Sequence, residues 1–290
     1  MYTKNKKVKI TVLIFLSLIT ISFVTQKKTN DNVLSVREGN VNLQSYSPYA
    51  KKTQAVFLDT ISTLRFESDL PFLNGATALY PVYSAFVQAV YPKKKYDWFR
   101  GEVACNNTIR AYEKLINKTA DIIFVAPPSK KQLEEAEKAG VKFRYIPIGK
   151  EAFVFFVNSQ NPVNNLTVEQ LQAIYSNEIT NWKELGGKDE TIRPFQRNEN
   201  SGSQTAFVHF MEGKTIMEPP IENVHNIMEP IVAQTADYKN YGNAIGFSFR
   251  FYVKEMVKNK KVKILKINGV YPDLETIGNV HIQCLLHFLP

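Results

Sequence analysis

The sequence predicts an α/β fold, and three observations support that class. From Leu73 onward, short apolar runs typical of buried strands alternate with segments that have helical periodicity. Such alternation favours sheets built mostly from parallel strands. The chain has 290 residues, which is enough for one large domain or for two lobes with a core each. Its composition, with 44% hydrophobic and 22% charged residues, is that of an ordinary folded protein.

The expected elements follow one another in a regular order. A capping box at Thr167 and Gln170 marks one helix start, and Gly140 marks one helix end. The sequence predicts helices over 82–91, 109–119, 130–140, 167–177 and 203–213, and strands over 120–129, 142–149, 152–158, 191–197, 244–257 and 261–269.

The amino terminus has the pattern of an export signal. Residues 1–28 contain six lysines and no acidic residue, and a mostly apolar run extends from Ile10 to Val24. A run of this length suits a signal peptide better than a membrane span, which needs about 20 residues. An uncleaved tether through residues 10–24 and a buried core helix remain alternatives. The net charge is +9, and without these six lysines it is +3, so nucleic acid is not an expected partner.

Cysteine and histidine usage argues for neither a disulfide nor a metal site. The two cysteines, Cys105 and Cys284, lie far apart in the chain and fit no disulfide framework, so two separate thiols are favoured over a bridge. The four histidines show no metal-ligand spacing. We therefore expect no metal and no other cofactor.

Three polar loops, each at the start of an expected helix, are the candidate binding elements. They read NGAT over 74–77, CNNT over 105–108 and RNENSGSQT over 197–205. The first N–H groups of a helix have no partner within the helix and lie at the positive end of its dipole, so they favour a bound anion. Arg197 can add a guanidinium that donates two parallel hydrogen bonds to an oxyanion.

Helix capping is the alternative explanation for each loop. Ser, Thr and Asn are common N-caps, which favours capping for CNNT and leaves both readings open for NGAT. The third loop indicates an anion site more strongly, because Arg197 and the turn over 201–203 exceed what a cap requires. A serine nucleophile at Ser201 or Ser203 has little support, because the chain has no G-x-S-x-G motif and no histidine in a triad context.

Residues 70–277 resemble a known family, the phosphate-specific ABC-transporter substrate-binding proteins of the PstS-like group. NGATALYPVYSAF is similar to the first phosphate loop and helix of that family, and INKTADIIFVAPPS to its strand containing ADI. The segment over 151–187, which contains ITNW, is similar to its crossover strand, helix and turn. RNENSGSQTAF is similar to its arginine-containing phosphate loop, and AIGFSF to the strand that returns to the first lobe.

The resemblance implies a two-lobed, periplasmic-binding-protein-like fold of type II, with mixed sheets flanked by helices and two crossover strands as a hinge. Residues 280–290 depart from the family pattern and read as a truncated or frameshifted terminus. The implied division is a signal peptide or anchor over 1–26, a lead-in over 27–69, lobe one over 70–147 plus 248–290, and lobe two over 148–247.

The resemblance also implies ligand-binding residues in both lobes. Some family members carry an Asp after the ADI strand, which accepts the proton of phosphate and repels fully deprotonated sulfate. Here Ala126 stands at that position, and Glu199 is an alternative source of a carboxylate. The implied ligand-binding residues are Ala76, Thr77 and Thr108 from lobe one, and Arg197, Ser201, Gly202 and Ser203 from lobe two.

The function that follows is non-enzymatic capture of inorganic phosphate by an exported monomer. The protein would lie in the periplasm or at the cell surface and would deliver its ligand to an ABC-transporter permease. Two alternatives stay open. One is an extracytoplasmic anion-sensing or interaction domain without a transport role, and the other is a degraded paralogue that binds another oxyanion, such as sulfate or molybdate.

Overall fold

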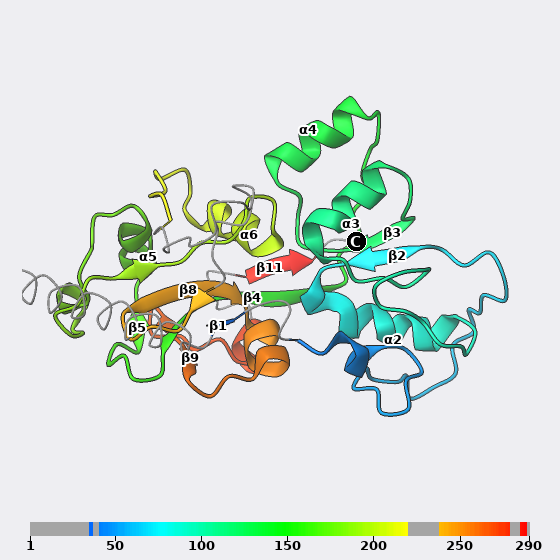
Figure 1. Ribbon diagram of the computed structural model, residues 1–290, viewed down its shortest axis with the longest axis horizontal. Coiled ribbons are helices and arrows are strands. Elements are labelled where there is room, and N and C mark those ends of the chain that lie inside the picture. The colour runs from blue at the N-terminus through cyan, green and yellow to red at the C-terminus, as the bar shows by residue number, and fades with distance from the viewer. Residues whose placement is uncertain (1–34, 37–40, 220–237, 279–284, 289–290) are drawn as a thin grey trace, which may run out of the picture.

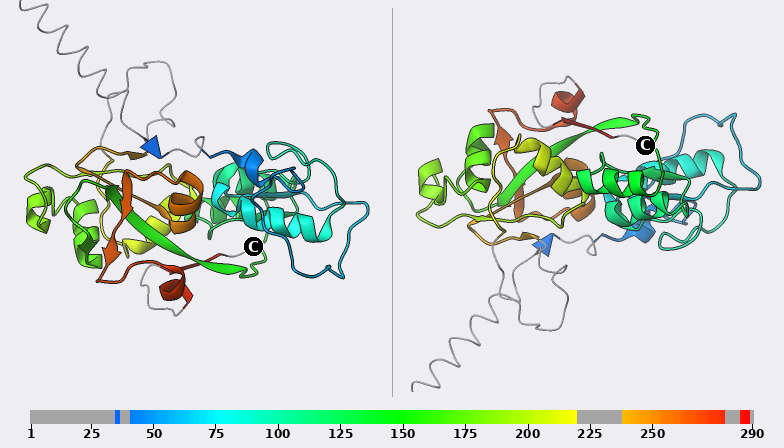
Figure 2. Two further views of the ribbon diagram at one scale, coloured as in Figure 1. Left: turned by 90° about the horizontal axis from the view of Figure 1, so that it is seen from below. Right: turned by 90° about the horizontal axis from the view of Figure 1, so that it is seen from above.

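The computed structural model describes residues 35–36, 41–219, 238–278 and 285–288. Two lobes lie end to end, and the views of Figure 2 show the same elongated arrangement. The expected α/β class and the expected two lobes are therefore confirmed. The predictions for residues 1–26, for most of the lead-in before residue 41 and for much of 280–290 lie outside the described residues.

The elements are short, and their bounds define the labels of Figure 1. The helices are α2 (Tyr80–Val90), α3 (Asn107–Ile116), α4 (Lys130–Lys138), α5 (Val168–Tyr175), α6 (Gly202–Phe210) and α7 (Leu274–Gly278), with 3₁₀ turns η2 (Leu43–Tyr46), η3 (Thr77–Leu79) and η4 (Trp182–Leu185) and the π-helical turn η6 (Tyr252–Val257). The strands are β1 (Ser35–Val36), β2 (Leu73–Gly75), β3 (Ile122–Phe124), β4 (Gly149–Asn158), β5 (Asn165–Leu166), β6 (Arg193–Pro194), β7 (Tyr238–Lys239), β8 (Ala244–Phe249), β9 (Val262–Ile264), β10 (Lys266–Ile267) and β11 (Leu285–Phe288).

The first lobe is built on the parallel pair β2 and β3, with α2, α3 and α4 around it (Figure 1). Tyr83 of α2 stacks on Phe124 of β3, and their ring centroids are 4.9 Å apart. Gly75 at the end of β2 is required by this packing, because a Cβ there would lie 2.6 Å from the carbonyl oxygen of Phe124. The chain leaves both strands toward the junction with the other lobe (Figure 1).

The second lobe contains the larger sheet, in which β4 is central. Strand β8 pairs antiparallel with β4 from Phe153↔Phe249 to Val157↔Ile245, and β9 and β11 also run antiparallel to β4. Only the short β6 pairs in parallel, with β8. The prediction of mostly parallel strands is therefore wrong for this sheet. The reason is that β8 returns the chain along β4, whereas parallel pairing requires a crossover that restarts each strand in the same direction.

Aromatic packing fixes α6 against this sheet. Phe207 of α6 stacks on Phe247 of β8, with 4.4 Å between ring centroids and 8° between ring planes. Tyr175 of α5 meets Phe207 edge to face at 4.6 Å. All three side chains are buried. This packing holds the N-terminus of α6 toward α3 of the first lobe (Figure 1).

Several expected strands differ from those observed. The strand expected over 244–257 ends at Phe249, and Tyr252–Val257 forms the π-helical turn η6 instead. The strand expected over 120–129 is reduced to β3. Residues 142–148 form no strand, and the strand expected over 191–197 is reduced to β6. The strand expected over 261–269 divides into β9, which pairs with β4, and β10, which pairs with β5. None of the described helices is both long and apolar enough to cross a membrane, and residues 10–24 lie outside that search.

Candidate anion-binding site

The first candidate loop leads from β2 into η3 and α2. The backbone N–H of Ala76 donates to the carbonyl oxygen of Phe124 at 2.9 Å, so this amide belongs to the lobe-one sheet. Ala76 can therefore contribute space for an anion, whereas the N–H donors of this loop must come from the first turn of η3. Thr77 opens that turn and is buried.

The second loop is tied to the first by a pair of asparagines. Asn74 Nδ2 donates to Asn106 Oδ1 at 2.8 Å, and Asn74 Oδ1 accepts from the backbone N–H of Asn106 at 3.1 Å. Asn107 follows with φ of 70°, and its side chain accepts from the N–H of Arg110 at 3.1 Å. Thr108 comes next, in the first turn of α3, and is buried. The two loops thus form one rigid unit at the same end of lobe one.

The third loop begins at Arg197 and ends at the N-terminus of α6. The backbone N–H of Arg197 donates to Gln204 Oε1 at 2.8 Å, which ties the start of the loop to the helix. Ser201 is the N-cap, and its hydroxyl accepts from the N–H of Gln204 at 3.2 Å. A capping hydroxyl still has its own proton to donate, so capping and anion binding are compatible here. Ser203, in the first turn of the helix, is buried.

The third loop meets the second across the junction between the lobes. A Cβ placed on Gly202 would lie 3.1 Å from Thr108 Oγ1 and 3.2 Å from the Cβ of Ala126. A residue with a side chain would therefore push the two lobes apart at this point. The N-termini of α3 and α6 converge here, and their partial positive charges add in one place.

Two hydrogen bonds connect the third loop to the start of α4. Ser129 Oγ donates to Asn200 Oδ1 at 2.6 Å, and Gln132 Nε2 donates to the carbonyl oxygen of Asn200 at 3.2 Å. Asn200 has φ of 66°, a conformation that Asn tolerates better than most residues. We call these three residues the interlobe latch. They connect the start of α4 in lobe one to the third loop in lobe two.

Ala126, which follows β3, is held in place by a hydrogen bond from α3. The hydroxyl of Tyr112 in α3 donates to the carbonyl oxygen of Ala126 at 2.8 Å. Burial raises the pKa of Tyr112, so this hydroxyl remains a donor at any physiological pH. The bond fixes the distance between α3 and the residue that faces Gly202.

The structure brings some of the expected ligand residues together at the junction between the lobes, and it places Glu199, the alternative carboxylate, away from them. Thr108 and Ala126 both lie close to Gly202, and Ser201 and Ser203 flank Gly202 in the chain. Glu199 does not supply a carboxylate to this contact. Its side chain is 76% exposed and lies 3.5 Å from Lys131 Nζ.

A cavity of about 730 Å³ opens beside the first two loops. Thr77, Asn107 and buried Cys105 form part of its wall. Three cationic side chains also line it, namely Arg100, Arg110 and Lys114. Positive charge around an entrance attracts anions and raises their local concentration. Within the part of the chain that the structure describes, no group of three or more His, Cys, Asp or Glu side chains is placed to hold a metal ion.

Sequence reasoning missed the residues that connect the loops. Asn74 lies in the first loop and Asn106 in the second. The position of these polar side chains beside a buried strand is the sequence feature that could have indicated their contact. Ser129 and Asn200 are 71 positions apart, and nothing in either local sequence indicates that they meet.

The chain is similar to known proteins in sequence and in fold. A family model described as the PBP superfamily domain matches residues 71–280. The phosphate-binding protein PstS of Bacillus subtilis (strain 168) is 30% identical over 146 residues, which cover 49% of this chain and 45% of that protein. The PstS protein of Borreliella burgdorferi is 24% identical over 217 residues, which cover 71% of this chain and 72% of that protein. The chain thus spans less than half the length of the Bacillus relative.

A crystal structure from Clostridium perfringens has a similar fold. It is described as a phosphate ABC transporter substrate-binding protein with bound phosphate. The two chains are 24% identical, the TM-score is 0.54, and the match covers 76% of this chain and 84% of the other. The similarity at this identity concerns the fold. Because the family model spans both lobes and the junction between them, this chain belongs to the PBP superfamily.

Proposed function

We propose that the protein is an extracytoplasmic, non-enzymatic solute-binding protein that captures inorganic phosphate between its two lobes. It would work as a monomer and deliver the anion to an ABC-transporter permease. The relatives named as phosphate-binding proteins support the choice of ligand. The observation that carries the proposal is the convergence of α3 and α6 at Gly202 and Thr108.

The proposed ligand shell draws on both lobes. Arg197 would supply the charge and a two-pronged donor, and the hydroxyls of Ser201 and Ser203 would donate beside it. Thr77 and Thr108 would donate from the opposite lobe. A site of oriented dipoles and one guanidinium can replace the hydration of a dianion without a metal. Because both lobes contribute, the ligand binds the closed state better and favours closure.

The boundaries of the lobes belong to the same proposal. We assign 70–147 to lobe one and 148–247 to lobe two. The chain from 248 onward, expected in lobe one, pairs with strands of lobe two through β9, β10 and β11, so these strands belong to lobe two. The crossover strands β4 and β8 would then form the hinge.

Discrimination between phosphate and sulfate should be weak. A carboxylate in the site would accept the proton of phosphate and repel sulfate. Neither position that the sequence offered supplies one, because residue 126 is alanine and Glu199 faces Lys131 at the surface. We therefore expect sulfate to compete with phosphate far better than it would in a site that contains an Asp.

Calorimetric titration tests the proposal directly. Phosphate, sulfate and molybdate are each titrated into the folded chain, and phosphate should bind with the highest affinity. Arg197→Ala should weaken phosphate binding about 100-fold, because two charge-assisted hydrogen bonds are lost. Arg144→Ala is the matched control, since Arg144 is exposed and takes no part in the proposed shell.

The outcomes separate the alternatives. Absence of binding for every oxyanion by folded protein would refute anion capture and favour an interaction domain. Preference for sulfate or molybdate would retain the site but replace the ligand. Equal losses in Arg197→Ala and Arg144→Ala would show that binding depends on net charge and not on the third loop.

A further inference from the structure

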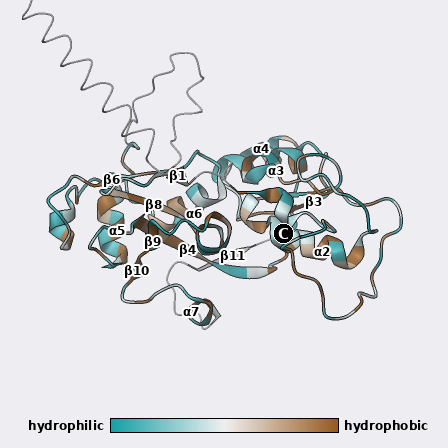
Figure 3. Cartoon of the chain, turned by 60° about the horizontal axis from the view of Figure 1, so that its bottom comes forward, coloured by the Kyte–Doolittle hydropathy of each residue, from teal (hydrophilic) through white to brown (hydrophobic). Residues whose placement is uncertain are grey.

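A second surface feature lies at the end of lobe one that is farthest from lobe two (Figure 1). We call residues 56–64 the apolar loop. Five large hydrophobic side chains in this short segment are each at least 57% exposed, and Ile61 reaches 86%. Figure 3 shows hydrophobic segments on the loop at this end of the molecule. The five side chains are Val56, Phe57, Leu58, Ile61 and Leu64. An apolar group of this kind on a surface indicates an interaction site.

The apolar loop is attached to the fold at both ends. Gln88 Nε2 donates to the carbonyl oxygen of Val56 at 2.8 Å. The backbone N–H of Phe66 donates to the carbonyl oxygen of Val90 at 2.8 Å. Gln88 and Val90, the partners in these two hydrogen bonds, both lie in the last turn of α2. The loop is thus presented by the C-terminal end of that helix, away from the candidate anion site.

Cationic side chains surround the same end of α2. Residues 51–69 contain three acidic residues, Asp59, Glu67 and Asp69, and three cations, so the positive excess at this end comes from the lysines that follow α2. A pocket lined by residues 47–50 and by Lys93–Tyr96 brings the lysines that follow α2 next to the start of this segment. The exposed cations on this surface are Lys51, Lys52, Arg65, Lys93, Lys94 and Lys95.

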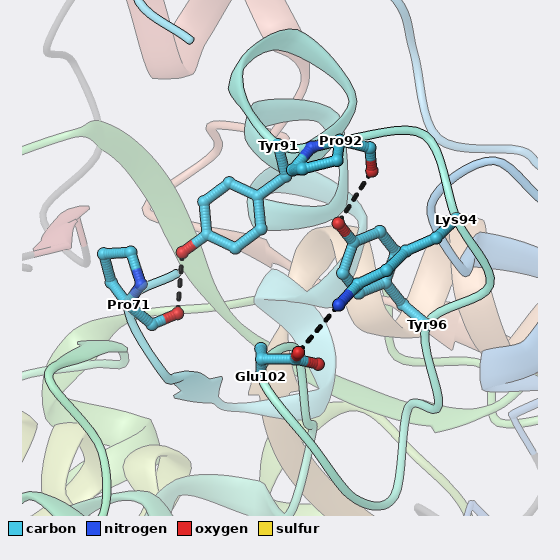
Figure 4. A network of polar contacts seen from close by, with 6 residues as sticks. All are labelled: Pro71, Tyr91, Pro92, Lys94, Tyr96 and Glu102. Carbon is cyan, nitrogen blue, oxygen red and sulfur yellow. Dashed lines mark hydrogen bonds and ion pairs between the residues drawn. The ribbon is translucent and has the colours of Figure 1, made fainter. Parts of the chain in front are cut away.

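A polar network fixes the lysine-bearing turn (Figure 4). The hydroxyl of Tyr91 donates to the carbonyl oxygen of Pro71 at 2.7 Å, and that of Tyr96 donates to Pro92 at 2.8 Å. Lys94 Nζ lies 2.7 Å from Glu102, and this bond lowers the pKa of the carboxyl group. Lys94 therefore holds the turn, while its neighbours at 93 and 95 extend the positive surface.

We propose that the apolar loop and the lysines around it dock onto an anionic lipid surface. Apolar side chains that enter the interface between lipid headgroups and tails, flanked by cations that meet the headgroups, are the pattern of peripheral membrane binding. A lipid surface is favoured over a protein partner because exposed lysines gather beside the loop, at Lys51, Lys52 and Lys93–Lys95. The stems of lysine side chains can lie along apolar surface while their ammonium groups reach headgroups. Docking at this end leaves the junction between the lobes accessible.

A tryptophan reporter in the full chain tests the proposal. Ile61→Trp is reconstituted, with its native N-terminal segment, in permease-free vesicles of phosphatidylcholine and phosphatidylglycerol that contain a brominated phosphatidylcholine. Bromine quenches tryptophan that enters the lipid. We expect roughly half of the added emission to be lost, since the side chain would enter the headgroup and acyl boundary. The parent chain gives the background from Trp98 and Trp182.

Two matched controls make the result specific. Leu274→Trp places the reporter at a side chain that is 78% exposed on α7, and it should show no quenching beyond the parent. Lys93→Gln with Lys95→Gln should reduce quenching of the reporter at residue 61, whereas Lys188→Gln with Lys266→Gln should not. All four of these lysines are exposed.

Three outcomes would overturn the proposal. The first is an absence of quenching at residue 61 beyond the parent, and the second is equal quenching in pure phosphatidylcholine vesicles. The third is quenching that appears only in a parallel set of vesicles that also contain the permease. The last outcome would assign the surface to a protein partner. Phosphate binding is measured separately, so failure here leaves the proposed function untouched.

Discussion

Gly202 occupies a position at which the lobes meet without room for a side chain. Its neighbours across the junction are Thr108 and Ala126, at 3.1 and 3.2 Å from where a Cβ would lie. Both distances are shorter than ordinary van der Waals contact, so Thr108 and Ala126 would have to shift to admit a methyl group at residue 202. The identity of this one residue therefore bears on whether the closed state forms.

Gly202→Ala should weaken phosphate binding while leaving the fold intact. The added methyl group would hold the lobes apart in the closed state, and overpacking of this kind costs about 1–3 kcal/mol, or on the order of tenfold in affinity. Calorimetric titration and urea unfolding measure the two effects separately.

Gly242→Ala is the matched control for this substitution. Nothing lies within 4 Å of a Cβ at residue 242, and its φ is not positive, so affinity should be unchanged. Equal affinity in Gly202→Ala and the parent chain would contradict the assignment of this contact to the closed, ligand-bound state.

At the scale of elements, Glu151 joins the two crossover strands. It lies in β4, and its carboxylate accepts from the N–H of Ala152 at 2.8 Å and from that of Phe251, just after β8, at 3.2 Å. Burial raises the pKa of Glu151 above its ordinary value of 4.5, and the two backbone hydrogen bonds and nearby Arg250 only partly offset this effect.

The raised pKa has a defined consequence for stability. The folded state binds this proton more tightly than the unfolded state, so the contribution to stability is complete below pH 4.5 and is lost as the pH rises through the folded pKa. Glu151→Gln cannot titrate. The melting temperature of the variant minus that of the parent should therefore increase between pH 4 and pH 7. A difference that stays constant over this range would contradict the assignment.

The elements also show which features of the fold could be predicted from sequence. Helix starts were predictable because caps are local: Thr167 Oγ1 accepts from the N–H of Gln170 at 3.1 Å, and the Gln170 side chain accepts from the N–H of Thr167 at 2.9 Å. The five expected helices are all present, with bounds shifted by a few residues. Strand direction was not predictable in the same way, because pairing of β8 with β4 joins residues about a hundred positions apart.

The candidate site likewise has features that local sequence predicts and features that depend on the arrangement of the lobes. Arg197, Ser201 and Thr108 could be proposed because each stands at a helix start with a recognisable polar motif. The actual meeting of α3 with α6 depends on how β4 and β8 place one lobe against the other, and no local pattern encodes that distance. The interlobe latch, which joins α4 to the third loop, could not be predicted for the same reason.

At the scale of the whole molecule, the interlobe latch should control how long the closed state lasts. Asn200→Gly keeps the residue tolerant of positive φ but removes the acceptor for Ser129 Oγ. Loss of one such hydrogen bond costs about 1 kcal/mol, which corresponds to an increase in the phosphate dissociation rate of about fivefold. Stopped-flow measurement of dissociation and association gives both rates, and the association rate should change little.

Asn177→Gly is the control for this variant. Asn177 also has positive φ, at 65°, but it follows α5, away from the latch. Its substitution should leave both rates unchanged. A similar rise in dissociation rate for both variants would show that backbone flexibility, and not the contact between lobes, sets the lifetime of the closed state.

The central claim is that a tetrahedral oxyanion binds between the lobes, in contact with residues from both. Diffraction from crystals of the chain grown with arsenate tests it most directly, because arsenate matches phosphate in shape and charge and arsenic is located by its anomalous scattering. We expect one arsenic peak within hydrogen-bonding reach of Arg197 and Thr108. A peak found only at the exposed lysines Lys93–Lys95, or only in the cavity beside Arg100 and Lys114, would contradict the claim.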